Sequence, residues 1–180
     1  QGISNKISSI NPAEPAALAN LLGASREIDE VQDEGAITEE EEENLKGDLG
    51  EKFSDWIRAR VNEIGPAGPG TPRNFFELQA VQRTGEYSEL CDPETKQYTD
   101  DQMRDRWNEC IRYWVDDIDP ADPDSIKDIF GLQKIQKTAK YDELTTSDTH
   151  QYKEEQMGEK VNEWFRNRVD EIDPSDPDSL

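Results

Sequence analysis

The chain repeats itself at an offset of 54 residues. Residues 114–126 read WVDDIDPADPDSI, and residues 168–180 read RVDEIDPSDPDSL. When residues 73–126 are aligned with residues 127–180, nearly half of the positions are identical and no gap is needed. The matching positions are mostly apolar, aromatic or turn residues, which are the ones that a shared fold requires. A period of this kind indicates that each copy forms one supersecondary unit.

A diverged third copy precedes these two. The segment VNEIGP, which begins at Val61, stands 54 residues before the segment VDDIDP, which begins at Val115. We therefore expect a flexible lead-in at 1–12, a diverged helical repeat 1 with a Gly/Pro linker at 13–72, helical repeat 2 at 73–126 and helical repeat 3 at 127–180. The predicted fold class is all-α, with three tandem helical-hairpin repeats of about 54 residues.

The second half of each copy has the spacing of an amphipathic helix. Repeat 2 has apolar residues at intervals of four, four, four and three, namely Met103, Trp107, Ile111, Val115 and Ile118. Repeat 3 has the same pattern at Met157, Val161, Phe165, Val169 and Ile172. Such spacing places the side chains on one face of an α-helix. The Asp-Pro pair that follows should end each helix, because the residue before a proline disfavours the helical conformation.

The helix starts are predicted from capping residues. Thr99 is the expected cap of the second helix in repeat 2, and Asn74 and Ser125 are the expected caps of the first helices in repeats 2 and 3. In repeat 1, Thr38 and Glu41 have the spacing of a capping box. Thr38 lies further from the end of its helix than Thr99 does, so the second helix of repeat 1 should be longer by about two turns.

The apolar pattern also predicts the cores. We expect buried side chains at Phe76, Trp107, Ile111, Val115, Phe130, Phe165 and Val169. On this interpretation Phe130→Ala should cost about 3–5 kcal/mol, because it would leave a cavity.

The charge of the chain excludes several classes of partner. There are 42 acidic and 20 basic residues, and the net charge is −22. A chain this acidic repels nucleic acid and anionic membranes, so we expect neither as a partner. No apolar run is long enough to span a bilayer, so membrane insertion is not expected.

The two cysteines, Cys91 and Cys110, leave two interpretations open. They could form a disulfide, which would favour secretion or an organelle lumen over the cytoplasm, or they could be free thiols. Residue 1 is Gln rather than Met, so the chain is expected to be a processed product or a fragment. With only one histidine, His150, a zinc site built from Cys and His is not expected.

No arrangement typical of an active site is present. A nucleophile with a neighbouring base, or paired carboxylates in an apolar setting, would indicate catalysis. The serines and threonines instead stand at expected caps and turns, and no acidic residue is singled out by an apolar environment. We therefore expect no enzyme activity and no cofactor, calcium being the one exception considered.

Acidic residues at the ends of the long helices break a local rule. Asp116 and Asp117, like Asp170 and Glu171, stand near a helix C-terminus, where a negative charge is unfavourable by about 0.3–1 kcal/mol. One explanation is a calcium site formed by Asp116, Asp119, Asp122 and Asp124, since calcium takes six to eight oxygen ligands. The spacing is not that of an EF-hand. Without a cation, replacing Asp116 and Asp117 by Asn should stabilise the protein slightly.

The other explanation is a docking surface for a protein partner with a basic surface. Its residues would be Trp114, Asp116, Asp117, Asp119, Asp170, Glu171 and Asp173. The sequence thus predicts a non-catalytic acidic repeat protein that acts as a scaffold, linker or structural subunit of a larger assembly. The alternative is a calcium- or cation-binding protein, and a weaker one is a helical carrier of an apolar ligand.

The end of the sequence gives a further expectation. Asp178 and Ser179 match Asp124 and Ser125, which precede the first helix of repeat 3. A helix start is therefore present at the end of the chain without the helix. We expect residues 1–180 to be part of a longer precursor that contains further copies of the same repeat.

Overall fold

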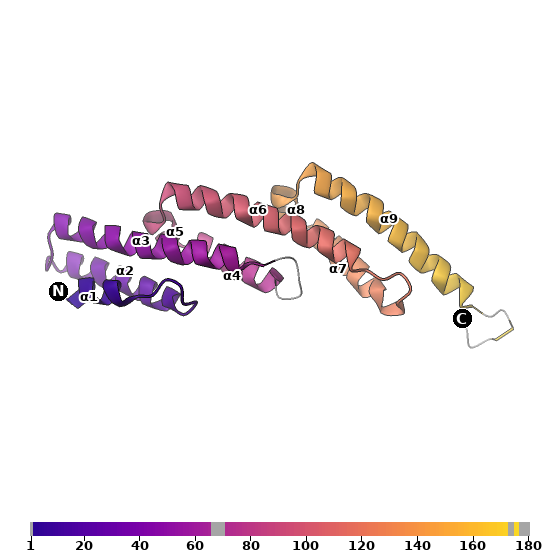
Figure 1. The fold of residues 1–180 in the computed structure, drawn as a ribbon, viewed down its shortest axis with the longest axis horizontal. Coiled ribbons are helices and arrows are strands. Elements are labelled where there is room, and N and C mark those ends of the chain that lie inside the picture. Colours follow the sequence, from indigo (N-terminus) through magenta and orange to yellow (C-terminus); the bar gives the residue numbers. More distant parts are fainter. Residues whose placement is uncertain (1, 66–70, 173–174, 177–180) are drawn as a thin grey trace. The chain divides into compact units, whose positions relative to one another are not determined.

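In the computed structural model, residues 2–65, 71–172 and 175–176 are described, and they form helices and turns without any strand. The all-α fold class is confirmed (Figure 1). Contacts divide these residues into two compact units, unit 1 up to Met103 and unit 2 from Arg104.

Unit 1 is formed around one long helix. Helices α1 (Gly2–Ser9), α2 (Ala17–Asp33) and α3 (Glu39–Glu63) pack against one another, and α4 (Thr71–Gln82) and α5 (Gly85–Leu90) pack on α3. The first part of α6 (Pro93–Asp116) completes the unit. Leu21, Ile28, Phe53 and Ile57 are fully buried in it. At Gly50 a Cβ atom would stand 2.8 Å from the carbonyl oxygen of Leu90, so glycine allows α3 to approach the end of α5.

Unit 2 has the same kind of core at the end of α6. A 3₁₀ turn (Pro123–Ser125) leads into α7 (Ile126–Gln136), and α8 (Ala139–Leu144) and α9 (Ser147–Asp170) follow. The central cluster contains Val115, Ile118, Ile129, Leu132 and Met157, with Trp114, Ile126 and Val161 packed around it. These residues come from α6, α7 and α9, so the cluster holds the three helices together.

The long helices begin earlier than the sequence analysis predicts. Thr38 and Glu41 form the expected capping box of α3. Thr99 is not a cap: it lies inside α6, where its hydroxyl donates to the carbonyl oxygen of Thr95. The helix starts at Pro93, and a carboxylate oxygen of Asp92 accepts from the backbone N–H of Thr95 at 2.8 Å. Proline suits the first helical position because its missing N–H has no partner there anyway.

The second helices are therefore of nearly equal length. Helix α3 has 25 residues, and α6 and α9 have 24 each. The expected two extra turns in repeat 1 are wrong. In α9 the cap is Thr146, whose hydroxyl accepts from the backbone N–H of Thr149.

The connections also contain more helix than a simple hairpin. The segments expected to be loops form the short helices α5 and α8, which bury Tyr87, Leu90 and Tyr141. Asn74 lies inside α4, and the Ser125 hydroxyl donates to the carbonyl oxygen of Asp119 instead of capping α7. Neither residue is the predicted cap.

The expectation of a flexible lead-in at 1–12 is wrong for the described residues 2–12. Residues 2–9 form α1, and Ile7 and Ile10 are buried. Ile3, Ile7 and Ile10 have helical spacing, and they place an apolar side of this segment against α2 and α3. The ammonium group of Lys52 holds the end of the segment by donating to the carbonyl oxygen of Ile10 at 3.2 Å.

The predicted core is correct in α6 and wrong in three other helices. Trp107, Ile111 and Val115 are at most 3% exposed. The exposed fractions of the others are 46% for Phe76, 54% for Phe130, 56% for Phe165 and 61% for Val169. In α4 and α7 the side chain before the expected phenylalanine is buried instead, at Phe75 and Ile129. One residue turns a helix by about 100°, which places Phe130 on the outer side.

We expect this difference in burial to appear in stability. Ile111→Ala should lower the free energy of unfolding by about 2–5 kcal/mol, because it leaves a cavity in a filled core. Phe130→Ala should lower it by less than about 1 kcal/mol, because the ring is more than half exposed. Urea denaturation followed by circular dichroism measures both. Equal costs for the two variants would contradict the packing of α7.

Candidate functional site

A polar joint connects the end of α3 to the beginning of α6 in unit 1. The Arg58 guanidinium donates to the Thr95 hydroxyl at 2.8 Å and lies over the Tyr98 ring, 5.1 Å from its centroid. The Tyr98 hydroxyl donates to the side-chain oxygen of Asn62 at 2.6 Å. Arg58 is thus held between a hydroxyl and an aromatic face that stand three residues apart on the partner helix.

Unit 2 contains the same joint between the end of α6 and the beginning of α9. The Arg112 guanidinium donates to the Thr149 hydroxyl at 3.3 Å and lies over the Tyr152 ring, 5.0 Å from its centroid. The Tyr152 hydroxyl donates to the carboxylate of Asp116. This bond raises the pKa of Tyr152. Each of these four residues stands 54 positions after its counterpart in unit 1.

A second contact recurs beside each joint. The Ser54 hydroxyl accepts from the backbone N–H of Asp92, and the Asn108 side chain accepts from the backbone N–H of Thr146 at 2.9 Å. Asp92 and Thr146 are the residues at the starts of α6 and α9. Hydrogen bonds to the Asp92 carboxylate from Thr95 lower the pKa of Asp92 to about 2. Each long helix therefore fixes the first turn of the next.

Cations tether the turns before α2 and α7 in the same way. Lys52 donates to the carbonyl oxygen of Ile10, and Lys160 to that of Ile118. A matching pair of arginines donates to alanine carbonyl oxygens, Arg60 to Ala13 at 2.7 Å and Arg168 to Ala121 at 2.9 Å. The segment INPAEP at residues 10–15 thus has the contacts of IDPADP at residues 118–123. The sequence analysis missed this match, although the two prolines and the isoleucine agree.

The acidic end of α6 has a compensating cation inside the chain. The Lys160 ammonium donates to the carbonyl oxygen of Asp116 at 2.8 Å and also to that of Ile118. A positive charge at a helix C-terminus is favourable, so Lys160 offsets the acids that break the local rule. The side chain of Asp116 has its own partner in Tyr152, whereas Asp117 is exposed. The small gain expected from replacing both acids by Asn stays a prediction.

The proposed calcium ligands are not gathered in the structure. Among the described residues, no three Asp, Glu, His or Cys side chains stand close enough together to hold a metal ion. Asp119 and Asp122 accept from backbone N–H groups two residues ahead, and Asp124 pairs with Lys127 at 2.7 Å. These oxygens serve the turn between α6 and α7.

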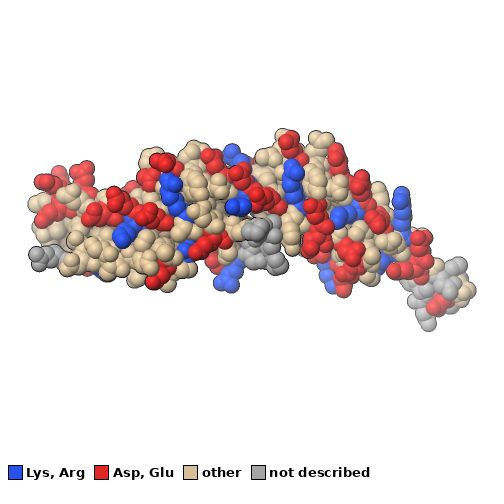
Figure 2. Space-filling model, viewed as in Figure 1, with Lys and Arg blue, Asp and Glu red and all other residues tan. Residues whose placement is uncertain are grey.

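The residues predicted to bind a partner have mixed positions. Trp114 is half-buried, and its ring stands edge-on to that of Trp107. Asp170 is exposed, and Glu171 pairs with Arg168 at 3.0 Å. Asp173 lies outside the described residues. Acidic side chains are spread over the visible surface of both units, with fewer basic ones among them (Figure 2).

Both cysteines are buried free thiols in the structure. Cys91 belongs to unit 1, where the Ser54 hydroxyl lies 3.9 Å from its sulfur, and Cys110 belongs to unit 2. Burial raises the pKa of both thiols, to about 11 for Cys110. The alternative of a disulfide is not formed here, and the free-thiol interpretation holds for this structure.

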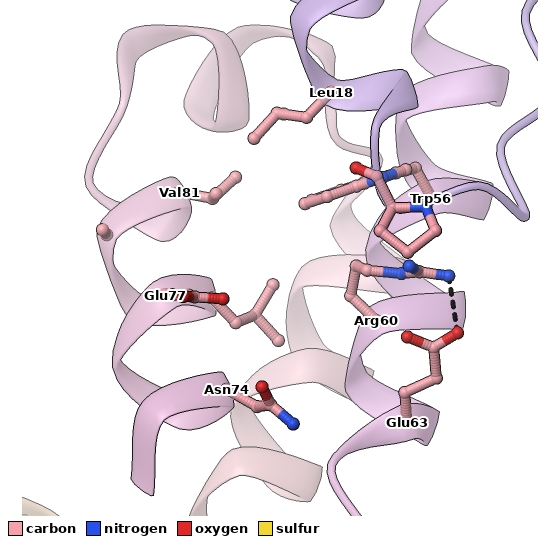
Figure 3. Close-up of a pocket in the computed structure, with 10 residues that line it drawn as sticks. Leu18, Trp56, Arg60, Glu63, Asn74, Glu77 and Val81 are labelled. Carbon is pink, nitrogen blue, oxygen red and sulfur yellow. Dashed lines mark hydrogen bonds and ion pairs between the residues drawn. The ribbon is translucent and has the colours of Figure 1, made fainter. Parts of the chain in front are cut away.

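The largest groove described in unit 1 lies between α3, α4 and the beginning of α2 (Figure 3). It has a volume of about 550 Å³, and its apolar lining includes Leu18, Trp56, Leu78 and Val81. Arg60 borders it, is only 10% exposed and pairs with Glu63. Within the described part of the chain, two nitrogens of Arg60, Nε and Nη1, have no hydrogen-bond partner.

A smaller groove of about 220 Å³ lies between α6 and α7 in unit 2. Most of its lining residues stand 54 positions after lining residues of the groove in unit 1, including Asp117, Leu132 and Ile135. Trp114 occupies the position of Arg60. The larger side chain accounts for the smaller space.

Comparison with known proteins gives no assignment: the chain matches no family model, no curated protein and no solved structure. None of the described helices is long and apolar enough to cross a membrane. Inference about function therefore depends on the contacts above.

The joints make a prediction with a built-in control. Arg58→Ala and Arg112→Ala should each lower the free energy of unfolding by about 1–2 kcal/mol, because each removes a hydrogen bond and a cation–π contact. Arg166 occupies the same position on α9, and within the described residues it has no hydrogen-bond or ion-pair partner. Arg166→Ala should therefore change stability by less than about 0.5 kcal/mol. Urea denaturation measures the three variants, and similar values for all of them would contradict the joint.

Proposed function

We propose that this chain is a non-catalytic scaffold made of tandem helical-hairpin repeats of about 54 residues. Each repeat contributes one long helix, and the polar joint fixes the next repeat on its end. A protein of this kind serves as a linker or structural subunit of a larger assembly, because its length is set by the number of repeats and its surfaces recur at regular intervals. Several weak contacts with an assembly then add through effective concentration.

The observation that carries this proposal is the recurrence of the joint. The contacts of Arg58 with Thr95 and Tyr98 return at Arg112 with Thr149 and Tyr152. Two geometries of this detail at the sequence offset of the repeat support a single module that is used more than once.

Two further features support a scaffold rather than an enzyme. The raised pKa values of Cys91 and Cys110 keep both thiols protonated at neutral pH, and the thiolate is the nucleophilic form. The excess of acidic residues favours a partner with a basic surface, and screening should weaken such an association as the salt concentration rises.

Removing one repeat in register tests the modular architecture. Deletion of residues 59–112 joins Arg58 directly to Tyr113, so α3 continues into the end of α6. Arg58 should then meet Thr149 and Tyr152, and Ser54 should meet the start of α9. We expect a shortened chain that is helical by circular dichroism and unfolds in one cooperative transition.

The matched control removes two more residues, 59–114. Two residues turn a helix by about 200°, so Val115 would leave the apolar face and the core of unit 2 would lose its contact with the hybrid helix. This variant should unfold at a clearly lower urea concentration. If both deletions behave alike, the modular scaffold is wrong.

The groove in unit 1 favours a second candidate, a carrier of an apolar ligand. Its lining is mainly apolar, and the unpaired nitrogens of Arg60 at its border would suit a carboxylate head group (Figure 3). Arg168 has the same two unpaired nitrogens and the same position over a tryptophan, which indicates that this arrangement also has a structural role. The scaffold is therefore our first proposal.

Titration calorimetry with decanoate tests the carrier. Ala80 lines the groove and is exposed, so Ala80→Phe should fill the space without disturbing the core. We expect binding to the unmodified chain and at least about tenfold weaker binding to this variant. Ala139→Phe on α8 adds the same side chain away from the groove and should bind as the unmodified chain does. Equal binding by all three proteins would place the ligand elsewhere and reject the candidate.

A further inference from the structure

The C-terminal half of α9 presents an apolar face to solvent. Phe165, Val169 and Ile172 are 56%, 61% and 41% exposed. They stand at intervals of four and three residues, which places them on one side of the helix. Three large apolar side chains exposed on one face are unusual for the surface of a protein this acidic, and such faces mark interaction sites.

The matching positions on the other two long helices are covered. In the described structure, each residue 54 or 108 positions earlier is at most 2% exposed: Ile57, Val61 and Ile64 near the end of α3, and Ile111, Val115 and Ile118 near the end of α6. The sequence pattern is therefore the same on all three helices, and only α9 has nothing described against it.

The covers of the first two faces have a common chemistry. In unit 2, Ile129 and Leu132 of α7 and Met157 of α9 pack on Val115 and Ile118. In unit 1, α4 packs on α3, and its Phe75 and Leu78 are the residues that match Ile129 and Leu132. Each cover is thus a helix with two large apolar residues three positions apart, followed by the next long helix.

The polar half of the joint is also present on α9. Asn162, Arg166 and Asp170 match Asn108, Arg112 and Asp116 of α6. All three are exposed, and within the described residues none has a hydrogen-bond partner. On α6 the same three positions accept from a helix start, donate to a threonine and accept from a tyrosine.

We infer that this face of α9 docks one more module with the chemistry of residues 126–152. The occupant would bring a helix with two apolar residues three apart onto Phe165, Val169 and Ile172. Its second helix would have a threonine at the third position to accept from Arg166 and a tyrosine at the sixth to donate to Asp170. The inference rests on the proposed scaffold and adds the position and chemistry of its next contact.

A second copy of α9 is a poorer occupant of this face. Two such faces in contact would bring Glu163, Asp170 and Glu171 of both copies together, and like charges at a contact are unfavourable. They would also leave the donors of Arg166 without the hydroxyl and ring that Arg112 has. The continuity with the two covered faces favours a module of the repeat type.

An extended chain tests the inference. A copy of residues 127–180 is fused after Leu180, and Phe165→Ala and Val169→Ala are each made in the original and in the extended chain. In the original chain we expect each substitution to change the unfolding equilibrium constant by less than about threefold, because the side chains are exposed. In the extended chain each should raise it by about 30-fold or more, because burial under the added module makes the truncation leave a cavity.

Two matched positions serve as controls. Ile111→Ala should be strongly destabilising in both chains, and Phe130→Ala should have little effect in either. Arg166→Ala adds the polar half: it should be neutral in the original chain and raise the unfolding constant about fivefold or more in the extended one.

Equal effects of Phe165→Ala in the two chains would overturn the inference, since the added module would not cover the face. So would a dimer of the original chain in analytical ultracentrifugation that Phe165→Asp converts to monomer, because the occupant would then be a second copy. Failure here, with the in-register deletion of residues 59–112 still folded, would leave the modular scaffold standing. Failure of that deletion would reject the scaffold itself.

Discussion

An arginine held between a threonine hydroxyl and a tyrosine ring is the contact on which the arrangement of the long helices depends. Apolar faces alone would permit two helices to slide by a turn, because apolar contacts are not directional. Arg58 and Arg112 remove that freedom, since each must meet a hydroxyl and a ring three residues apart on the next helix. The apolar core supplies most of the stability, and the polar joint selects the register in which it forms.

The large negative charge is tolerated because the few cations are placed on backbone carbonyl groups. Lys52, Lys160 and Arg168 each donate to a carbonyl oxygen in a turn or at a helix end. These oxygens would otherwise be left without partners when a helix stops, and a cation there also opposes the negative end of the helix dipole. Many acids remain for solvent or for a partner.

The sequence predicts what depends on period and fails where coverage decides. The spacing that includes Trp107, Ile111 and Val115 correctly places them in a core, but the same spacing in α9 gives exposed Phe165 and Val169. Periodicity identifies the apolar side of a helix and says nothing about whether another element lies on it. The acids between α6 and α7 fail as a metal site for a different reason: Asp119 and Asp122 bind nearby backbone N–H groups, as aspartates in turns commonly do.

The exposed face of α9 is informative because of its polar neighbours. Apolar area alone would permit many occupants, since the energy of burial depends little on the identity of the partner. Asn162, Arg166 and Asp170 restrict the choice, because burying them against an apolar surface would leave three polar groups without hydrogen bonds, at a cost of about 1–3 kcal/mol each. A partner without the matching threonine and tyrosine is therefore rejected by the polar groups. The same reasoning explains why the joint has retained its geometry at both inner positions while Cys110 and Trp164, which match Trp56, have diverged.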